Sequence, residues 1–146
     1  MLVWTDGEEC RNGYSKNDGF QGSRRAVEYI RSKEREVQAV ICLDMLGDKD
    51  LHITIPRNGS AALSKIARHA ARRIGEGDLV QTIDESVKDD HVPFIEAGMK
   101  AVDLIDFDYG PNNSWWHTSE DTMDKLSRES FLKSGKLVVE MLNILL

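Results

Sequence analysis

The sequence predicts an α/β fold, a three-layer sandwich in which a mostly parallel central sheet carries helices on both faces. Short apolar runs of strand length alternate along the chain with longer stretches of helical periodicity. Acidic and aromatic residues gather directly after several of these runs. The length of 146 residues suits one domain. We therefore expect residues 1–146 to form a single α/β domain.

The first third of the chain is predicted to place a helix between two strands. The apolar run 2–4 is typical of a strand end, and it leads into Asp6-Gly7. Ser23 is expected to cap a helix that ends near Ser32. The apolar face of that helix consists of Ala26, Val27 and Ile30. A strand is expected within 37–45, where the nearly continuous apolar run predicts burial on both faces.

The middle of the chain predicts a half-exposed strand followed by a helix. Residues 51–55 alternate between aliphatic and polar side chains, so His52 and Thr54 should face away from the core. Residues 60–74 repeat their apolar positions with helical spacing, and Gly75 is expected to end the helix.

The next segment predicts a short strand over 79–83, a short helix over 92–97 that Gly98 ends, and an apolar strand over 101–105. A long loop rich in Asp, Asn, Gly and aromatic residues then runs from 106 to 124. Such composition is typical of a binding or catalytic loop.

The end of the chain predicts a final helix that Ser127 caps. Its expected buried stripe consists of Phe131, Leu132, Val138, Met141, Leu142 and Leu145.

Composition excludes several functions. The net charge of -6 disfavours binding to nucleic acid, because the cluster formed by Arg68, Arg72 and Arg73 is better explained as the wet face of a helix. No apolar run is long enough to span a membrane, and the compartment cannot be read from the sequence. Cys10 and Cys42 are expected to be free thiols, because they form no CxxC pair or disulfide framework.

Candidate functional residues follow the predicted strands. Glu8 and Glu9 come after the first strand, Asp44 after the second, and Asp106 with the loop that reaches His117 after the last. In open α/β sheets, ligands bind outside the carboxyl ends of the strands. Adjacent acids occur in this chain about as often as chance allows, so adjacency alone is uninformative. Gly7 distinguishes the Glu8-Glu9 pair, because a glycine can bend the backbone so that both side chains reach one site.

These residue types suit a hydrolytic zinc site. Such a site needs carboxylate and imidazole ligands, an open position for water, and a separate general base near that water. Glu9, Asp44 and His117 have suitable ligand chemistry, and Glu8 suits the general base. Their spacing matches no compact metal-binding motif, so the pattern alone leaves both a functional and a structural role open.

Five segments in order resemble a known family: Asp6–Glu9, Gly22–Arg24, Leu43–Gly47, Asp89–Phe94 and Trp116–Thr118. The order is similar to that in the zinc-dependent exopeptidases, which include bacterial leucyl-type aminopeptidases and glutaminyl cyclases. The resemblance covers nearly the whole chain and corresponds to the C-terminal part of the family domain. It implies the same layered α/β fold, with the N-terminal part of the domain missing.

The resemblance also implies a role for each matching residue. Glu8 would be the general acid and base, Glu9 a zinc ligand, and His117 the late imidazole ligand. Asp44 would bind a second zinc ion in the aminopeptidases, or join a proton-handling hydrogen-bond network in the one-zinc cyclases. Asp90 resembles an outer carboxylate of that network, although a helix-capping role would also explain it.

Trp116 resembles an aromatic wall of the substrate pocket, and simple packing remains an alternative. Family members carry a further aspartate ligand upstream of the segment that matches Asp6–Glu9, and this chain begins too late to include it. We therefore expect one or two zinc ions held by an incomplete set of ligands.

Three functions remain open at this point. The first is a zinc-dependent aminopeptidase-like hydrolase that acts on peptides with a free N-terminus. The second is a glutaminyl-peptide cyclotransferase, which closes an N-terminal glutaminyl residue onto itself. The third is a non-catalytic peptide-binding or assembly module, in which an exposed apolar sheet edge would favour homo-oligomers.

Overall fold

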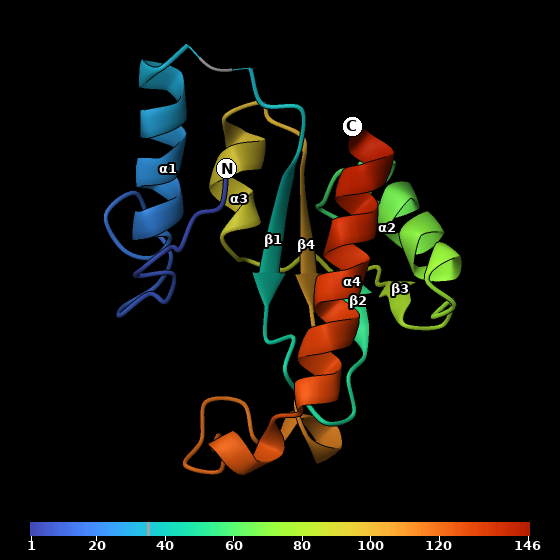
Figure 1. The fold of residues 1–146 in the computed structure, drawn as a ribbon. Helices are drawn as coiled ribbons and strands as arrows, with labels where there is room; N and C mark the ends of the chain where they lie inside the picture. The colour runs from blue at the N-terminus through green and yellow to red at the C-terminus, as the bar shows by residue number, and fades with distance from the viewer. Residues whose placement is uncertain (35) are drawn as a thin grey trace.

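The computed structural model describes residues 1–34 and 36–146 and shows an α/β fold (Figure 1). The elements follow one another as α1 (Gln21–Ser32), β1 (Val40–Asp44), β2 (Ile53–Ile55), α2 (Ala61–Arg73), β3 (Val80–Thr82), α3 (His91–Glu96), β4 (Ala101–Ile105) and α4 (Arg128–Leu145). Two short 3-10 turns, Pro111–Asn113 and Met123–Lys125, lie between β4 and α4. The predicted fold class is therefore confirmed.

The sheet is mixed, with the strand order β1-β4-β2-β3. β1 runs parallel to β4, and β2 runs parallel to β3. β2 is antiparallel to β4, where Thr54 lies opposite Ile105. The carboxyl ends of β1 and β4 therefore meet at one edge of the sheet, and the carboxyl end of β2 points the opposite way.

Helices cover both faces of the sheet (Figure 1). α2 and α4 pack on each other and on one face, where a buried apolar cluster joins them to β2, β3 and β4. α1 and α3 pack on each other at the other face, and their apolar side chains contact Ala101 and Val40. The chain thus forms the expected three layers.

Strand β4 is the centre of the molecule, and all five of its residues are buried. Because strand side chains alternate, Val102 and Leu104 join the α2 and α4 cluster, while Ala101 faces α1 and α3. Asp103 lies on the same face as Ala101. An acidic side chain therefore sits under helix α3 with no exposed surface.

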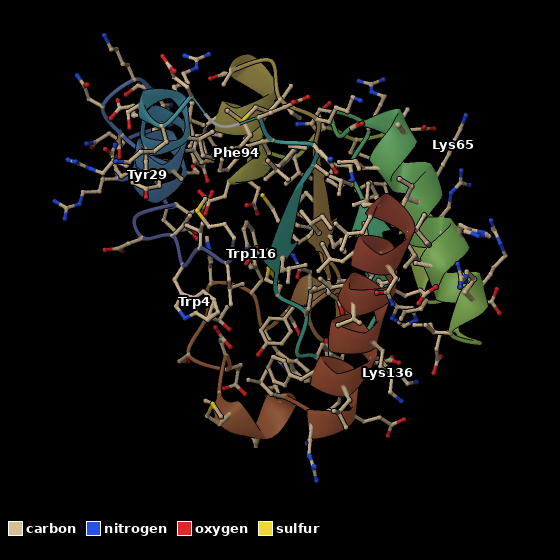
Figure 2. All side chains as sticks on the ribbon, turned by 45° about the horizontal axis from the view of Figure 1, so that its top comes forward. Trp4, Tyr29, Lys65, Phe94, Trp116 and Lys136 are labelled. Atoms are coloured by element: carbon tan, nitrogen blue, oxygen red, sulfur yellow. The ribbon has the colours of Figure 1, made fainter. Side chains whose placement is uncertain are left out.

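The strand expected at residues 2–4 is absent, and the strand expected within 37–45 is present as β1 without the expected burial on both faces. Residues 1–6 form no strand, and the side chains of Met1, Leu2 and Trp4 are more than three quarters exposed (Figure 2). β1 is an edge strand that is only partly covered, and Leu43 is 50% exposed. The physical reason is pairing, because among the described residues no strand lies on the outer side of β1.

The remaining strands and the middle helices agree with the sequence. β2 buries Ile53 and Ile55 and leaves Thr54 partly exposed, as its alternation predicted. α2 ends before Gly75, and α3 ends before Gly98, both of which have a positive φ.

Helix α1 begins two residues before the predicted cap. Ser23 lies inside the helix and donates its hydroxyl hydrogen bond to the Phe20 carbonyl instead of capping. The predicted face of Ala26, Val27 and Ile30 is buried. Backbone carbonyls from the N-terminal segment take the place of a side-chain cap, and a sequence pattern cannot show such a long-range partner.

Helix α4 starts as predicted, because the Ser127 side chain accepts hydrogen bonds from the Glu129 and Ser130 N–H groups. Its buried stripe is rotated from the expected one. Leu137 and Met141 are fully buried, whereas Phe131, Leu132 and Leu142 are about half exposed. The apolar surface of α4 is wider than the sheet can cover. Among the described residues, no helix is both long and apolar enough to cross a membrane.

Candidate active site

The structure brings Glu9 and His117 into direct contact although they lie 108 positions apart. His117 Nε2 is 2.6 Å from Glu9 Oε1, and both side chains are more than half exposed. Glu9 comes from the N-terminal segment, and His117 comes from the loop after β4. The two residues expected to share a cation therefore meet at the carboxyl-end edge of the sheet.

The backbone around Glu8 and Glu9 is held by the start of α1. The carbonyls of Asp6, Gly7 and Glu8 accept hydrogen bonds of 2.7–2.9 Å from the N–H groups of residues 22, 21 and 20. These donors belong to the first turn of the helix and would otherwise lack partners. A Cβ on Gly22 would lie 2.4 Å from the Asp6 nitrogen, so this close approach requires glycine.

Glu8 is oriented by Tyr14. The Tyr14 hydroxyl donates a 2.9 Å hydrogen bond to Glu8 Oε1, and the Tyr14 ring stacks on Phe20 with centroids 4.4 Å apart. Burial raises the pKa of Glu8, the Tyr14 hydrogen bond lowers it, and neighbouring carboxylates, led by Glu9, raise it. The net shift is upward, towards the range in which a carboxylate can both take and return a proton near neutral pH.

Asp44 lies at the carboxyl end of β1 and shares a side-chain hydrogen bond with Asp89. Burial raises the pKa of Asp44 more than this bond lowers it. Burial and the adjacent Asp44 raise the pKa of Asp89 to about 8. Two carboxyl groups can share a hydrogen bond only when one is protonated, and both raised pKa values fit a shared proton.

Asp89 is the member of the Asp89-Asp90 pair that contacts Asp44. Asp90 instead accepts a hydrogen bond from the Thr5 hydroxyl, and its side chain makes no cap bond to α3. Asp90, the expected outer carboxylate, also lies close enough to Glu8 and Asp44 for its charge to raise their pKa values, and Asp89 is a further acid that was assigned no role from the sequence. The adjacent acids were the available signal, but which of them turns inward depends on the exact first residue of α3.

Two further titratable residues lie behind Asp89 on the same face of the sheet. Asp103 of β4 and His91 of α3 have no exposed surface, and His91 Nδ1 is 3.6 Å from Asp103 Oδ2. Burial and the charge of Asp89 raise the pKa of Asp103 to about 9. Burial lowers the pKa of His91 to about 4, so its imidazole is neutral. The sequence analysis assigned neither residue.

Trp116 packs beside the candidate ligand. Its ring stacks on the His117 ring with centroids 4.0 Å apart, and the Phe107 ring lies 5.5 Å from it. Trp116 is 38% exposed and Phe107 is 37% exposed, so both present an aromatic surface to solvent next to His117. The expected substrate wall, Trp116, therefore lies beside the expected ligand His117. Phe107 is an addition that the sequence analysis did not single out.

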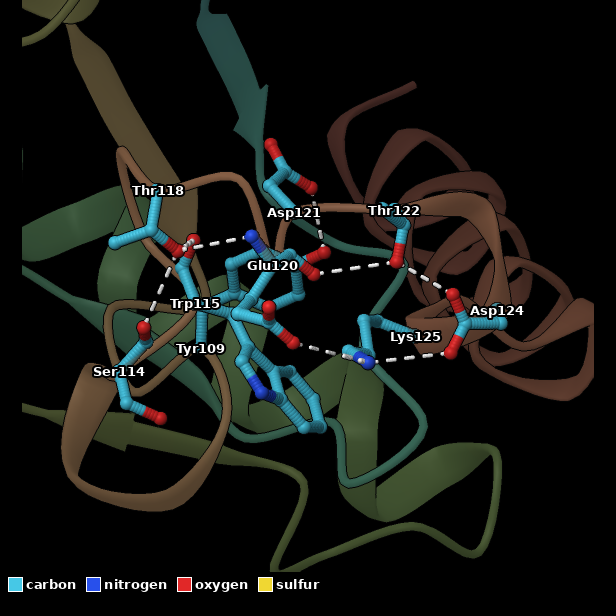
Figure 3. Close-up of polar contacts among 9 residues, drawn as sticks. All are labelled: Tyr109, Ser114, Trp115, Thr118, Glu120, Asp121, Thr122, Asp124 and Lys125. Carbon is cyan, nitrogen blue, oxygen red and sulfur yellow. Dashed lines mark hydrogen bonds and ion pairs between the residues drawn. The ribbon is translucent and has the colours of Figure 1, made fainter.

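The loop that carries His117 is braced by its own polar contacts (Figure 3). The Tyr109 hydroxyl donates a 2.7 Å hydrogen bond to Asp121, and the Trp115 ring packs edge-on against the Tyr109 ring. Lys125 Nζ lies 5.0 Å from the centre of the Trp115 ring. Gly110 has a positive φ, and a Cβ there would lie 2.3 Å from the Trp115 ring. A well-supported loop therefore holds His117 in place.

Asp106 belongs to the scaffold. Its carboxylate accepts hydrogen bonds from the backbone N–H groups of His52 and Asp108, which tie the end of β4 to β2 and to the following loop. Its position after β4 agrees with the prediction, whereas its side chain forms hydrogen bonds only to backbone N–H groups. The predicted free thiols are confirmed for Cys10 and Cys42.

The donor set suits a zinc ion at the outer edge of this site. Glu9 and His117 offer an oxygen and a nitrogen already in contact, and separating them by about 1 Å would admit an ion that sits about 2 Å from each. The charge of Glu9 also reaches Asp44 and raises its pKa, so this third carboxylate is close by. These donors fit part of the expected zinc site, with Glu8 beside them.

Comparison with known proteins agrees with this geometry. The sequence profile of peptidase family M28 matches residues 1–142. The chain belongs to peptidase family M28. It is 30% identical over 128 residues to the aminopeptidase YwaD of Bacillus subtilis, an alignment that covers 82% of this chain and 28% of that protein. It is 28% identical to the glutaminyl-peptide cyclotransferase-like protein of Bos taurus, covering 84% of this chain and 36% of that protein.

Solved structures of M28-like proteins share the fold. An Acidobacteriales bacterium glutaminyl cyclase superposes with a TM-score of 0.89 at 33% identity, covering 97% of this chain and 51% of that one. A zinc aminopeptidase from Bacillus subtilis superposes with a TM-score of 0.69 at 27% identity, covering 84% and 32%. The chain thus spans about half or less of the length of these relatives.

Proposed function

We propose that this M28 protein catalyses zinc-dependent chemistry at peptide N-termini and that its reaction is cyclisation of an N-terminal glutaminyl residue. The observation that supports cyclisation is the closeness of the Asp44 carboxyl group to that of the buried Asp89. Because Asp44 is paired with a buried acid, it is better suited to a proton-handling network than to binding a second metal ion. The 33% identity to a glutaminyl cyclase structure supports the same choice.

In this reaction the α-amine attacks the carbon of the side-chain amide, a C–N bond forms, and ammonia leaves. Zinc held by Glu9 and His117 would polarise the amide carbonyl. Glu8 takes a proton from the attacking amine and delivers it to the leaving ammonia. Tyr14 holds Glu8 in place through its 2.9 Å hydrogen bond, and Asp44 and the buried Asp89 lie near Glu8.

The substrate side chain and backbone would lie against the aromatic surface. Trp116 and Phe107 form an apolar wall beside His117 and exclude water from one side of the reacting amide. Peptides with a free N-terminus are thus the proposed partners. Homo-oligomers formed through the open β1 edge remain a proposal that a sedimentation measurement would test.

A zinc-dependent aminopeptidase is the second candidate, and the 30% identity to the aminopeptidase YwaD supports it. Glu8 would then take a proton from a water molecule and pass it to the leaving amine. This candidate needs Asp44 as a metal ligand, so Asp44 would have to leave Asp89. The third candidate from the sequence, a non-catalytic peptide-binding or assembly module, predicts no turnover with either type of substrate.

The test is a paired assay of the zinc-loaded protein. Glutaminyl peptides are incubated with the protein. The release of ammonia is measured, together with the loss of about 17 mass units, the mass of NH3, from the peptide. Leucyl amides are assayed in parallel for free leucine. The cyclase proposal expects the first reaction and not the second. Release of leucine without cyclisation would show that the aminopeptidase candidate is correct.

The matched control replaces an acid outside the site. Glu129→Gln changes an exposed acid in the first turn of α4 and should leave turnover unchanged, whereas Glu8→Gln should abolish it. Equal activity in wild type and Glu8→Gln would show that the measured turnover does not come from this site.

A further inference from the structure

Behind the candidate active site, Asp89, His91 and Asp103 form a second cluster of potential ligand atoms. One atom from each residue lies within 4.8 Å of the other two, and all three side chains are buried. His91 is the first residue of α3, Asp89 lies two residues before it, and Asp103 comes from the middle of β4. The cluster therefore joins a helix to the central strand inside the molecule.

The hydrogen-bonding capacity of two members of this cluster, Asp103 and His91, is unused. Both carboxylate oxygens of Asp103 and both ring nitrogens of His91 lack a hydrogen-bond partner among the described residues. Asp103 and His91 have no exposed surface, so bulk water cannot supply the missing partners. Buried polar groups are normally paired, and four unpaired atoms in one place need an explanation.

The cluster also lies among further acidic side chains. Glu8, Asp44 and Asp90 surround Asp89 and Asp103 closely enough to disfavour their ionisation. Within the described part of the chain, no lysine or arginine forms an ion pair with any of these carboxylates. Buried charges are normally paired with opposite charge or with a metal ion.

We propose that Asp89, His91 and Asp103 bind a divalent transition-metal ion, with zinc as the expected metal, at a site separate from the one formed by Glu9 and His117. The geometry supports this assignment. Ligands of a tetrahedral zinc ion lie about 3.4 Å apart, and His91 Nδ1 and Asp103 Oδ2 are 3.6 Å apart. Asp89 needs to move inward by no more than about 1 Å to complete the set.

The ligand types select the class of metal. Two carboxylates and one imidazole favour zinc or a similar transition metal, whereas calcium and magnesium prefer sites made only of oxygen atoms. The ion enters past Asp89, which is the most exposed of the three and adjoins Asp44.

Cobalt binding tests the proposal without reference to turnover. The chain with Glu9→Gln and His117→Gln lacks the outer ligands, so any remaining cobalt reports the inner site. We expect this variant to bind about one equivalent of cobalt and to show a shifted imidazole N–H proton signal that exchanges slowly, because His91 is buried. Adding Asp103→Asn or His91→Gln should weaken cobalt binding at least about 10-fold.

His69→Gln is the matched control, because His69 is an exposed histidine on α2 and should not affect cobalt binding. A chain without outer ligands that binds no cobalt, or whose cobalt signal exchanges rapidly, overturns the proposal even if the inner variants do not fold. Cobalt binding that is insensitive to both inner substitutions also overturns it. None of these outcomes depends on the proposed cyclisation, which the paired assay tests separately.

Discussion

The outer and inner halves of the site differ in how the protein holds them. Glu9 and His117 form the outer half, are more than half exposed, and come from a terminal segment and a loop. Asp89, His91 and Asp103 form the inner half and are buried, and they come from the start of α3, the bend just before it, and β4. Glu8, Asp44 and Tyr14 lie between them.

This difference separates chemistry from stability. Exposed ion pairs contribute little to the free energy of folding, because water competes for the same groups. Buried and unpaired acids cost free energy whenever they ionise. Changes in the outer half should therefore alter metal binding with little effect on folding. Changes in the inner half should alter folding itself and its dependence on pH.

The largest expected effect is on turnover. Replacement of Glu8 by Gln removes the group that moves the proton and leaves the ligands unchanged. We expect kcat/KM to fall by a factor of about 100 or more, while zinc content measured by mass spectrometry stays the same. Loss of zinc together with activity would instead place Glu8 among the ligands.

The next effect is on stability as a function of pH. Asp89 and Asp103 have pKa values raised to about 8 and about 9, above the value of about 3.9 for an unfolded aspartate. The folded chain therefore holds more protons than the unfolded chain between about pH 4 and those values, and stability falls as pH rises through this window. For the metal-free protein, we expect chemical denaturation to show this fall in the free energy of unfolding, with a flatter profile for Asp103→Asn. A profile that is flat in the wild type would contradict the inner-half assignment.

A smaller effect is expected for Tyr14→Phe. The substitution removes the hydrogen bond that lowers the pKa of Glu8, so that pKa should rise. The acidic limb of the kcat/KM profile should move to higher pH, with a loss of about 3–10-fold near neutral pH. If the acidic limb does not move, the ionisation of Glu8 is not the titration that this limb reports.

The smallest expected effect is that of a substitution in the outer pair, Glu9 and His117, on the free energy of unfolding. His117→Gln should change the free energy of unfolding of the metal-free chain by less than about 0.5 kcal/mol, while zinc affinity falls at least about 10-fold. Urea denaturation and a zinc titration give the two values. A large loss of stability would show that the exposed contact with Glu9 has a structural role.

The same contrast explains what the sequence could predict. Periodicity predicts helices α2, α3 and α4 and strands β2, β3 and β4. In these elements, the neighbouring elements bury the face that the local apolar pattern marks. The segment before Asp6 was expected to be a strand but lacks a partner strand, and pairing is not a local property. The start of α1 was missed because its N–H groups bond to carbonyls from a distant segment.

For the site, residue chemistry and the order of the matching segments identified the exposed residues. The buried residues of the site could not be identified from the sequence. Glu8, Glu9 and His117 stand in recognisable segments, and the structure places them together. Asp89 was passed over for Asp90, because the sequence does not fix which side of a helix start faces inward. Asp103 lies within an apolar strand and gave no signal as an isolated acid. His91 was likewise treated as part of a segment rather than as a buried partner.

The two thiols of this chain differ in a way that provides a practical probe. Cys42 lies beside Asp103 across the β1 and β4 pair, where burial and the surrounding carboxylates raise the pKa of its thiol. It should therefore react slowly with maleimides at neutral pH. Cys10 is bonded directly to Glu9, so a dye attached there would sit beside the outer ligand pair. Selective labelling of this one cysteine would turn metal uptake into a fluorescence change without any added mutation.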